Sequence, residues 1–345
     1  MTDTMEKTDT TTEFLARHGW HNARLTNLDE TGASLRRYQR VHGENGKTAI
    51  ITYVADPKME ITRFTEVADL LRSMDLSAPE IYGYDIDAKL LLQEDFGDNS
   101  FSRLIAGGEN EKSLHLLATD VLLHIQKHFT AEDEKRWASK LLRYDFQQWK
   151  SGFASLSNFY LHYLPCVGGP ALSETEQAEF LGLWQKLLAP FEAVPNTLLM
   201  RDFKPANMMI LNGRTGHQKV GLIDFQDAGL GSPFYDLVEL TQSWKRDLPT
   251  EIADAVLAQY AKGRPEFSAE MTRSGCMAFG AVRWICWLSS CARYAREGRP
   301  QFLANIPGIW RAAETCLADP ALAELERWFN HYAPQGLRAP QKVAA

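Results

Sequence analysis

Cysteine is scarce in this 345-residue chain and shows no pattern of a disulfide framework. The five cysteines are odd in number and scattered, and none is spaced as Cys-x-x-Cys; they are Cys166, Cys276, Cys286, Cys291 and Cys316. We therefore expect reduced thiols that pack as small core hydrophobes in a cytoplasmic protein.

Long apolar runs are also missing. No stretch reaches the roughly 18 uninterrupted apolar residues that a membrane-spanning helix needs. The richest segment, Met277 to Ala295, carries Arg283 and Arg293 among its tryptophans, which is typical of a buried core helix. The polar N-terminal residues 1–14 do not contain the apolar core of a secretory signal. The sequence therefore predicts no contact with a membrane.

Basic residues are outnumbered, with 37 Lys and Arg against 44 Asp and Glu and a formal net charge of −7. Nucleic acid is therefore not an expected partner, because binding to phosphate backbones depends on clustered Lys and Arg. The 45% hydrophobic and 23% charged content is typical of a globular protein. At about 150 residues per domain, the length predicts roughly two domains.

Short β-type runs surround one helical pattern in the first part of the chain. Runs at 35–41 and 48–54 are joined by HGENGK, whose Asn45-Gly46 predicts a hairpin turn. A helical pattern follows at 61–74, and two further β-type runs, EIYGYDI and KLLLQEDF, come after it. The predicted order is strand, strand, helix, strand, strand.

Beyond residue 97 the periodicity is mostly helical, interrupted by the β-type runs NMMILNG and KVGLIDF. This pattern predicts an α+β fold with two lobes and a cleft between them, and clefts at domain junctions are preferred ligand sites. We expect a disordered tail at 1–12, an N-lobe at 13–96 with a small antiparallel sheet and one helix, a helical C-lobe at 97–335, and a second tail at 336–345.

Two neighbouring segments, MRDFKPANMMI and GLIDFQDAG, contain the residues that suggest chemistry. Asp202 and Asn207 are five residues apart, and Asp224 follows an apolar run. Phosphoryl transfer needs a carboxylate that orients the attacking hydroxyl, and oxygen ligands for the Mg²⁺ that bridges the nucleotide phosphates. This set of residues therefore predicts a kinase.

These segments resemble the aminoglycoside phosphotransferase (APH) family of small-molecule kinases, within the protein-kinase-like superfamily. Arg201, Asp202 and Asn207 match the kinase pattern H-R-D-x-x-x-x-N, with Met200 in place of the His, and IDFQ stands where kinases have D-F-G. TGASLRRYQRV, LLLQEDFGDNSF, IDFQDAGLGSPFYDL and ARYAREGRPQFL look like segments of one branch, the bacterial anomeric kinases of N-acetylmuramate and N-acetylglucosamine. The resemblance covers about residues 14–330 in the same order.

The resemblance implies a protein-kinase-like fold and a role for each matching residue. Asp202 would be the catalytic base, Lys204 would steady the transferring phosphate, and Asn207 and Asp224 would hold Mg²⁺. Asp236 would brace the catalytic loop from behind.

The nucleotide side of the site is implied in the same way. The hairpin at 32–37 would cover the phosphates of ATP, with Ser34 facing them. Glu94 and its neighbours, in the linker between the lobes, would offer backbone hydrogen bonds to adenine.

One departure from the kinase pattern concerns the third strand, which normally carries a Lys that pairs with the α- and β-phosphates. AIITYVADP has no Lys; Lys47 precedes it and Lys58 follows Pro57. Our hypothesis is that Arg36 or Arg37, on the adjacent strand, supplies the missing positive charge.

The expected activity is ATP- and Mg²⁺-dependent transfer of the γ-phosphoryl group to a hydroxyl of a small molecule, with the anomeric hydroxyl of an amino sugar favoured. Two alternatives stay open at this point. The acceptor could be an aminoglycoside, choline, homoserine or a similar compound, or the chain could be a nucleotide-binding pseudokinase that regulates a partner. The absent strand Lys and Met200 favour the pseudokinase, whereas the intact Asp202, Asn207 and Asp224 oppose it.

Overall fold

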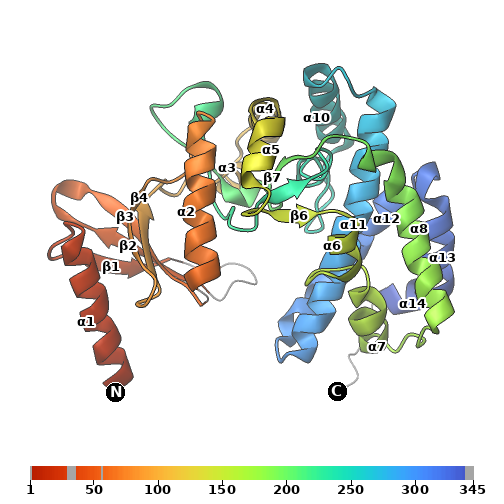
Figure 1. Cartoon of the computed structure of the whole chain (residues 1–345), viewed down its shortest axis with the longest axis horizontal. Coiled ribbons are helices and arrows are strands. Elements are labelled where there is room, and N and C mark those ends of the chain that lie inside the picture. Colours follow the sequence, from red (N-terminus) through yellow and green to blue (C-terminus); the bar gives the residue numbers. More distant parts are fainter. Residues whose placement is uncertain (1, 29–35, 56, 339–345) are drawn as a thin grey trace. The chain divides into compact units, whose positions relative to one another are not determined.

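A computed structural model describes residues 2–28, 36–55 and 57–338 of the chain. It contains two compact units: unit 1 comprises Met1–Glu109 and Pro205–Ala228, and unit 2 comprises Asn110–Lys204 and Gly229–Ala345 (Figure 1). The division differs from the predicted boundary at residue 96 in two ways: the first part of unit 1 runs to Glu109, and residues 205–228 return to unit 1. Backbone hydrogen bonds explain the return: Leu222 donates to Ser77 and Ile210 donates to Asn99, both at 2.8 Å.

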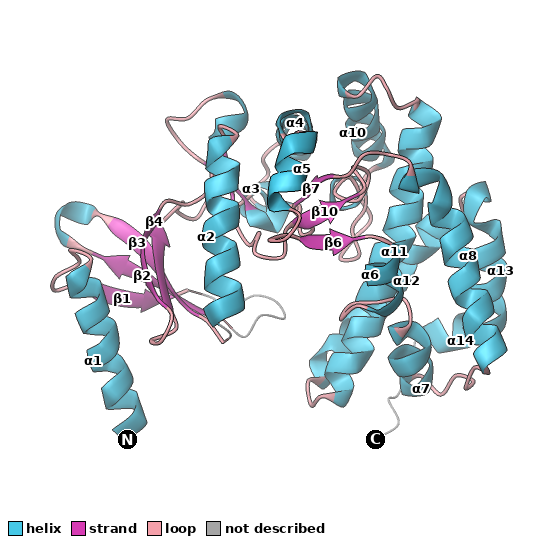
Figure 2. Cartoon of the chain, viewed as in Figure 1, coloured by secondary structure: helices cyan, strands magenta, loops and turns pink. Residues whose placement is uncertain are grey.

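Unit 1 contains a five-stranded antiparallel sheet (Figure 2). The strand order is β1-β2-β3-β5-β4, with β1 Arg24–Asn27, β2 Arg37–His42, β3 Thr48–Tyr53, β4 Ile81–Asp85 and β5 Leu90–Glu94. Helix α2 (Pro57–Ser73) lies between β3 and β4 in the chain, so β2, β3, α2, β4 and β5 follow the predicted order, whereas β1 was not predicted. Asn45 and Gly46 take the left-handed backbone that their turn between β2 and β3 requires, with φ of 60° and 75°.

Helix α1 (Thr2–Arg17) precedes this sheet, although the sequence predicted a disordered tail at 1–12. The helix is anchored at its C-terminal end, where Phe14 and Leu15 are buried in a cluster with Val41, Ile51 and Leu92. This burial stabilises the last turns, and the polar Thr-rich segment continues the helix from them. The prediction of disorder considered the composition of 1–12 alone and missed the apolar anchor that follows.

The remaining elements of unit 1 come from two parts of the chain: the 3-10 turn η1 Glu44–Gly46, α3 Phe101–Ala106, η3 Pro205–Asn207, β8 Met208–Ile210, η4 Gly216–Lys219 and β9 Val220–Leu222. Strands β8 and β9 form an antiparallel hairpin in which Met208 pairs with Leu222. After this hairpin, the buried ring of Phe225 stacks on Phe64 of α2, with ring centroids 4.5 Å apart.

Unit 2 contains a small three-stranded sheet of order β6-β10-β7. Strand β10 (Gly229–Gly231) is parallel to β6 (Leu142–Tyr144) and antiparallel to β7 (Thr197–Leu199). A Cβ added at Gly229 would lie 2.5 Å from the carbonyl oxygen of Leu142, so only glycine allows the two strands this close an approach.

The rest of unit 2 is helical: α4 Glu111–His128, α5 Ala131–Trp137, α6 Phe146–Ser151, the π-helical turn η2 Phe159–Tyr163, α7 Leu164–Cys166, α8 Glu174–Glu192, α9 Val238–Thr241, α10 Thr250–Gly263, α11 Ala269–Arg296, η5 Pro300–Asn305, α12 Ile306–Leu317, η6 Pro320–Leu322, α13 Ala323–Tyr332 and α14 Gln335–Arg338. The longest of these is α11 (Figure 1). Most of its side chains are buried, as predicted for the Trp-rich segment. Within the described ranges, no helix is long and apolar enough to cross a membrane.

The predicted C-terminal tail at 336–345 begins inside α14. The side chain of Arg338 is buried there and its guanidinium pairs with Glu314 at 2.7 Å. This ion pair explains why the helix continues past residue 335, and residues 339–345 lie outside the described part of the chain.

Candidate active site

The β8–β9 hairpin of unit 1 positions two of the predicted metal ligands. Asn207 directly precedes β8, and Asp224 follows β9 by two residues. The strands are antiparallel, so the start of β8 and the end of β9 lie at the same end of the hairpin. A backbone hydrogen bond of 3.1 Å from Ile223 N–H to the Asn207 carbonyl fixes this end.

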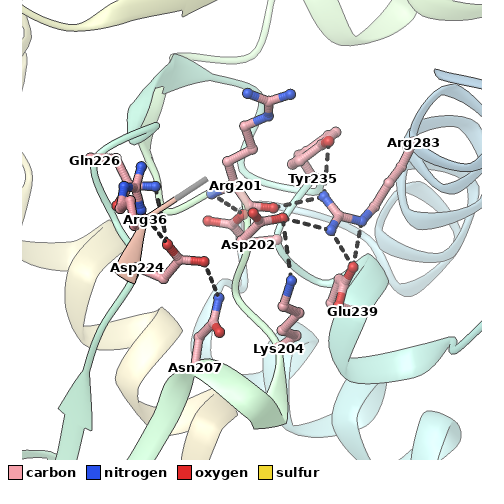
Figure 3. Close-up of polar contacts among 11 residues, drawn as sticks. Arg36, Arg201, Asp202, Lys204, Asn207, Asp224, Gln226, Tyr235, Glu239 and Arg283 are labelled. Atoms are coloured by element: carbon pink, nitrogen blue, oxygen red, sulfur yellow. Dashed lines mark hydrogen bonds and ion pairs between the residues drawn. The ribbon is translucent and has the colours of Figure 1, made fainter. Parts of the chain in front are cut away.

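Among the residues that the structure describes, Arg36, Gln226 and Asn207 donate to the Asp224 carboxylate (Figure 3). Arg36 Nη1 lies 3.0 Å and Gln226 Nε2 3.1 Å from Oδ1, and Asn207 Nδ2 lies 3.4 Å from Oδ2. Asp224 has a left-handed backbone with φ of 59°, which is uncommon for a residue other than glycine. Such backbone strain is concentrated at functional sites, where the surrounding contacts maintain it.

The spacing of Asn207 and Asp224 fits a shared magnesium ion. Mg²⁺ binds oxygens at about 2.0–2.1 Å in near-octahedral geometry, so adjacent ligand oxygens lie about 3 Å apart. The side chains already approach to 3.4 Å, and a half-turn of the Asn207 amide would place its oxygen where Nδ2 now lies. A carboxylate and an amide oxygen are adequate, because Mg²⁺ retains several waters.

The two candidate arginines of unit 1 differ in their contacts. Arg36 forms the ion pair with Asp224, whereas the guanidinium of Arg37 lies over the ring of Tyr53, 4.5 Å from its centroid. Of the two, Arg36 is therefore the one that reaches the predicted metal-binding group. Ser34, predicted to face the phosphates, lies outside the described residues.

The predicted backbone contacts of Glu94 and its neighbours to adenine remain a prediction, and the structure shows only that the Glu94 N–H is already paired. The Glu94 N–H donates to the carbonyl of Glu80 at 2.8 Å, and its carboxylate accepts from Arg214 at 2.9 Å. The N–H is committed within unit 1 because β5 pairs along its length with its neighbours. A backbone donor to adenine would therefore have to come from a neighbouring peptide group.

Asp202 belongs to unit 2, where two cations flank its carboxylate (Figure 3). Arg283 Nη2 lies 2.9 Å and Lys204 Nζ 4.0 Å from Asp202 Oδ1. Burial would raise the pKa of Asp202, but the positive charges of Lys204, Arg283 and Arg201 outweigh it and hold the pKa well below its usual range. The side chain is still 31% exposed, so an ionised carboxylate is accessible to a substrate.

Arg283, on α11, is a site residue that the sequence reasoning missed. All five of its N–H donors are engaged: two meet Glu239, and the others meet Asp202, the Arg201 carbonyl and the Tyr235 hydroxyl. Its side chain is only 11% exposed. A charged residue within the apolar, Trp-rich part of α11 was the available signal, because a buried charge needs a partner.

Asp236 holds the backbone of the loop that carries Asp202. Its carboxylate accepts from the N–H of Met200 at 2.7 Å and from that of Arg201 at 3.0 Å, which is the bracing contact expected. Burial raises the pKa of Asp236 to about 7, although these two donors favour its ionised form. Arg201 has a left-handed backbone with φ of 64°, so Asp236 stabilises a strained residue beside Asp202.

Comparison with known proteins gives similarity along nearly the whole chain. The sequence pattern of the phosphotransferase enzyme family (APH) matches residues 27–269. N-acetylmuramate/N-acetylglucosamine kinases of Caulobacter vibrioides and Pseudomonas aeruginosa are 30% and 27% identical to it, covering 97% and 95% of this chain and 99% and 94% of their own lengths. The solved structure of choline kinase LicA from Streptococcus pneumoniae, at 15% identity, has a TM-score of 0.61 and covers 92% of this chain and 99% of that chain.

These similarities confirm the predicted protein-kinase-like α+β fold and the predicted phosphotransferase activity toward a hydroxyl acceptor. The family match covers well over half of the residues, and the relative from Caulobacter vibrioides is similar from end to end. The chain belongs to the phosphotransferase enzyme (APH) family.

Proposed function

We propose that this protein transfers the γ-phosphoryl group of ATP to the anomeric hydroxyl of N-acetylmuramate or N-acetylglucosamine. The hydroxyl oxygen forms a bond to the γ-phosphorus, and the bond from that phosphorus to the β–γ bridging oxygen breaks. The hydroxyl proton passes to the Asp202 carboxylate, and the products are the sugar 1-phosphate and ADP.

Asp202 is the proposed general base, because it is an ionised and accessible carboxylate in the loop that matches the kinase pattern. A positioned base typically contributes about 10²- to 10⁴-fold to such a step. Lys204, beside it, would place a positive charge near the transferring phosphoryl group. Its charge would offset the negative charge that spreads over the phosphoryl oxygens.

Arg283 is a proposed positioning residue. Its donors are all engaged by protein groups, so its effect on the reaction would come through the carboxylate that it holds. Glu239 shares the guanidinium and balances its charge, which leaves Asp202 oriented without leaving a buried cation unpaired.

Asn207 and Asp224 are the proposed Mg²⁺ ligands, and the bound ion would supply charge neutralisation at the β- and γ-phosphates. Five residues separate Asp202 from Asn207, so covalent geometry keeps their Cα atoms within about 18 Å. Arg36 is proposed to supply the positive charge that kinases usually take from a strand Lys, because it already pairs with Asp224.

The observation that supports this acceptor is the end-to-end similarity to kinases named for N-acetylmuramate and N-acetylglucosamine. Similarity to the solved structures supports the fold alone, since their identity to this chain is far lower. The family assignment by itself is compatible with choline, aminoglycoside or homoserine acceptors.

An acceptor panel tests the proposal. ATP consumption would be measured with Mg²⁺ and each of N-acetylmuramate, N-acetylglucosamine, choline, homoserine and kanamycin, with the Asp202→Asn variant as the matched background. We expect turnover with the two amino sugars only. Turnover confined to another acceptor would overturn the sugar assignment, and no turnover with any acceptor alongside intact ATP binding would favour a pseudokinase.

A further inference from the structure

Arg293, in the last turn of α11, has a guanidinium in which two of the three nitrogens lack acceptors among the described residues. Its Nε and Nη2 atoms are buried and have no hydrogen-bond partner among the described residues. The whole side chain is 12% exposed. Burying charged N–H groups without acceptors is costly, so this arrangement points to an acceptor that is absent from the chain itself.

Around the Arg293 guanidinium lie two aromatic rings and one carboxylate at the outer limit of an ion pair. The ring of Phe153 lies over the guanidinium, 3.5 Å from its centre, and that of Tyr294 lies at 5.1 Å. The nearest charged partner, Glu297, lies 4.0 Å from Nε, beyond hydrogen-bond distance. The negative end of α11 favours a cation here, but a helix terminus does not satisfy the side-chain donors.

Phe153 covers the guanidinium from the solvent side and is itself 69% exposed. An exposed aromatic ring over a buried cation is unusual, because large apolar side chains are normally buried. Burial and the positive charges of Arg296 and Arg293 lower the pKa of His162, so this histidine adds no positive charge here. The groups that favour an incoming anion are therefore the two unpaired nitrogens of Arg293.

Contacts within unit 2 connect this position to the catalytic carboxylate. Arg283, which holds Asp202, lies over the ring of Tyr235, and Tyr235 stacks on Trp149 at 5.1 Å. Trp149 then fixes the loop that carries Phe153, because its carbonyl accepts from Leu156 N–H at 2.7 Å. Arg293 lies ten residues after Arg283, a rise of about 15 Å along α11.

We propose that Arg293 binds the carboxylate of an acidic substituent on the acceptor sugar, with Phe153 as the apolar cover of this subsite. The inference rests on the proposed function. N-acetylmuramate carries a lactyl ether that ends in a carboxylate, and N-acetylglucosamine has a hydroxyl in its place. A planar guanidinium matches a carboxylate with two parallel hydrogen bonds.

The test compares kcat/KM for the two sugars in the wild type, in Arg293→Gln, and in Arg273→Gln, which removes an exposed arginine from the same helix. We expect Arg293→Gln to lower kcat/KM for N-acetylmuramate about 10-fold or more, since hydrogen bonds between charged groups are among the stronger ones. The value for N-acetylglucosamine should stay within about twofold, and Arg273→Gln should change neither. An equal loss on both sugars, or no loss on either, would overturn the subsite.

A second comparison uses the methyl ester of N-acetylmuramate, which keeps the shape of the sugar but removes its charge. The wild type should prefer the acid over the ester, and Arg293→Gln should lose that preference, so a double-mutant cycle isolates the interaction even if the variant is less stable. A preference that survives in Arg293→Gln contradicts the subsite while leaving the kinase proposal intact. If the wild type phosphorylates neither sugar, the proposed function fails and this inference fails with it.

Discussion

The two groups of candidate site residues differ in how the chain holds them. In unit 1, Asn207 and Asp224 are 17 positions apart in the sequence and flank one short hairpin. The backbone pairing of its two strands fixes their geometry. In unit 2, Asp202 depends on Arg283, which lies 81 residues away on α11. The first group is a local structure, whereas the second exists only once distant elements have packed.

The difference also concerns charge. Asp224 pairs with Arg36, and a metal ion would compete with this pair because both cations are attracted to the same carboxylate. Asp202 pairs with Arg283, and the charge of Arg283 is already balanced by Glu239. We infer that the unit 1 group is arranged to accept a further cation, and that the unit 2 group is arranged to keep one carboxylate ionised and oriented.

The largest effect is expected from Asp202→Asn. This change removes the proton acceptor but retains the shape of the side chain, so kcat should fall by about 10²- to 10⁴-fold. Stabilisation of the protein by ATP and Mg²⁺ in thermal unfolding should remain, because the proposed metal ligands are unchanged. A variant with near-normal turnover would remove Asp202 from the mechanism.

Asp224→Asn should give the complementary result. Removing the negative ligand should lower kcat by at least about 100-fold and should also abolish the additional thermal stabilisation that Mg²⁺ gives to ATP binding. Chelation of divalent ions by EDTA should stop wild-type turnover, and added Mg²⁺ should restore it. If Asp224→Asn keeps the Mg²⁺-dependent stabilisation while losing activity, Asp224 is not the metal ligand that distinguishes the unit 1 group.

Arg283→Lys and Arg283→Ala test the link to α11, with Arg273→Ala as the control on the same helix. Both changes should lower kcat by about 10- to 100-fold with little change in the KM for ATP, because the base is misoriented rather than removed. Arg283 helps to hold the pKa of Asp202 low, so its loss in Arg283→Ala should raise that pKa. The acidic limb of the pH profile should therefore move to higher pH in Arg283→Ala and less so in Arg283→Lys. An unmoved limb in Arg283→Ala would contradict the proposed electrostatic role.

The smallest effect is expected from Arg36→Ala, compared with Arg37→Ala. Arg36 reaches Asp224 and Arg37 stacks on Tyr53, so only the first change should raise the KM for ATP, by about 10-fold. Arg37→Ala should stay within about twofold of the wild type in steady-state kinetics. Equal effects of the two substitutions would show that this difference in contacts has no consequence for nucleotide binding.

The sequence predicted Asp202 and most of the unit 1 group because the signals for these residues are local. The spacing of Asp202 and Asn207, the apolar run before Asp224 and the turn at Asn45-Gly46 can all be found within a few residues of each feature. Arg36 remained one of two alternatives, because the sequence does not show which of two adjacent side chains reaches Asp224. The ion pair in the structure separates them.

The sequence could not predict the partners of Asp202 in unit 2. Arg283 and Glu239 lie 44 residues apart, and nothing in their local patterns indicates that they meet. The same limit applies to helix α1. Its polar residues are helical because Phe14 and Leu15, at the end of the helix, are buried against the sheet. Contacts between distant segments arise from tertiary packing, which local propensity does not report.

The most direct measurement of the central claim is two-dimensional ¹H–³¹P correlation NMR of the product formed from ATP, Mg²⁺ and N-acetylglucosamine. The account predicts a cross-peak between a new phosphomonoester phosphorus and the anomeric proton, together with stoichiometric ADP. A phosphorus correlated with the C6 protons instead, or no sugar phosphate at all, would contradict it.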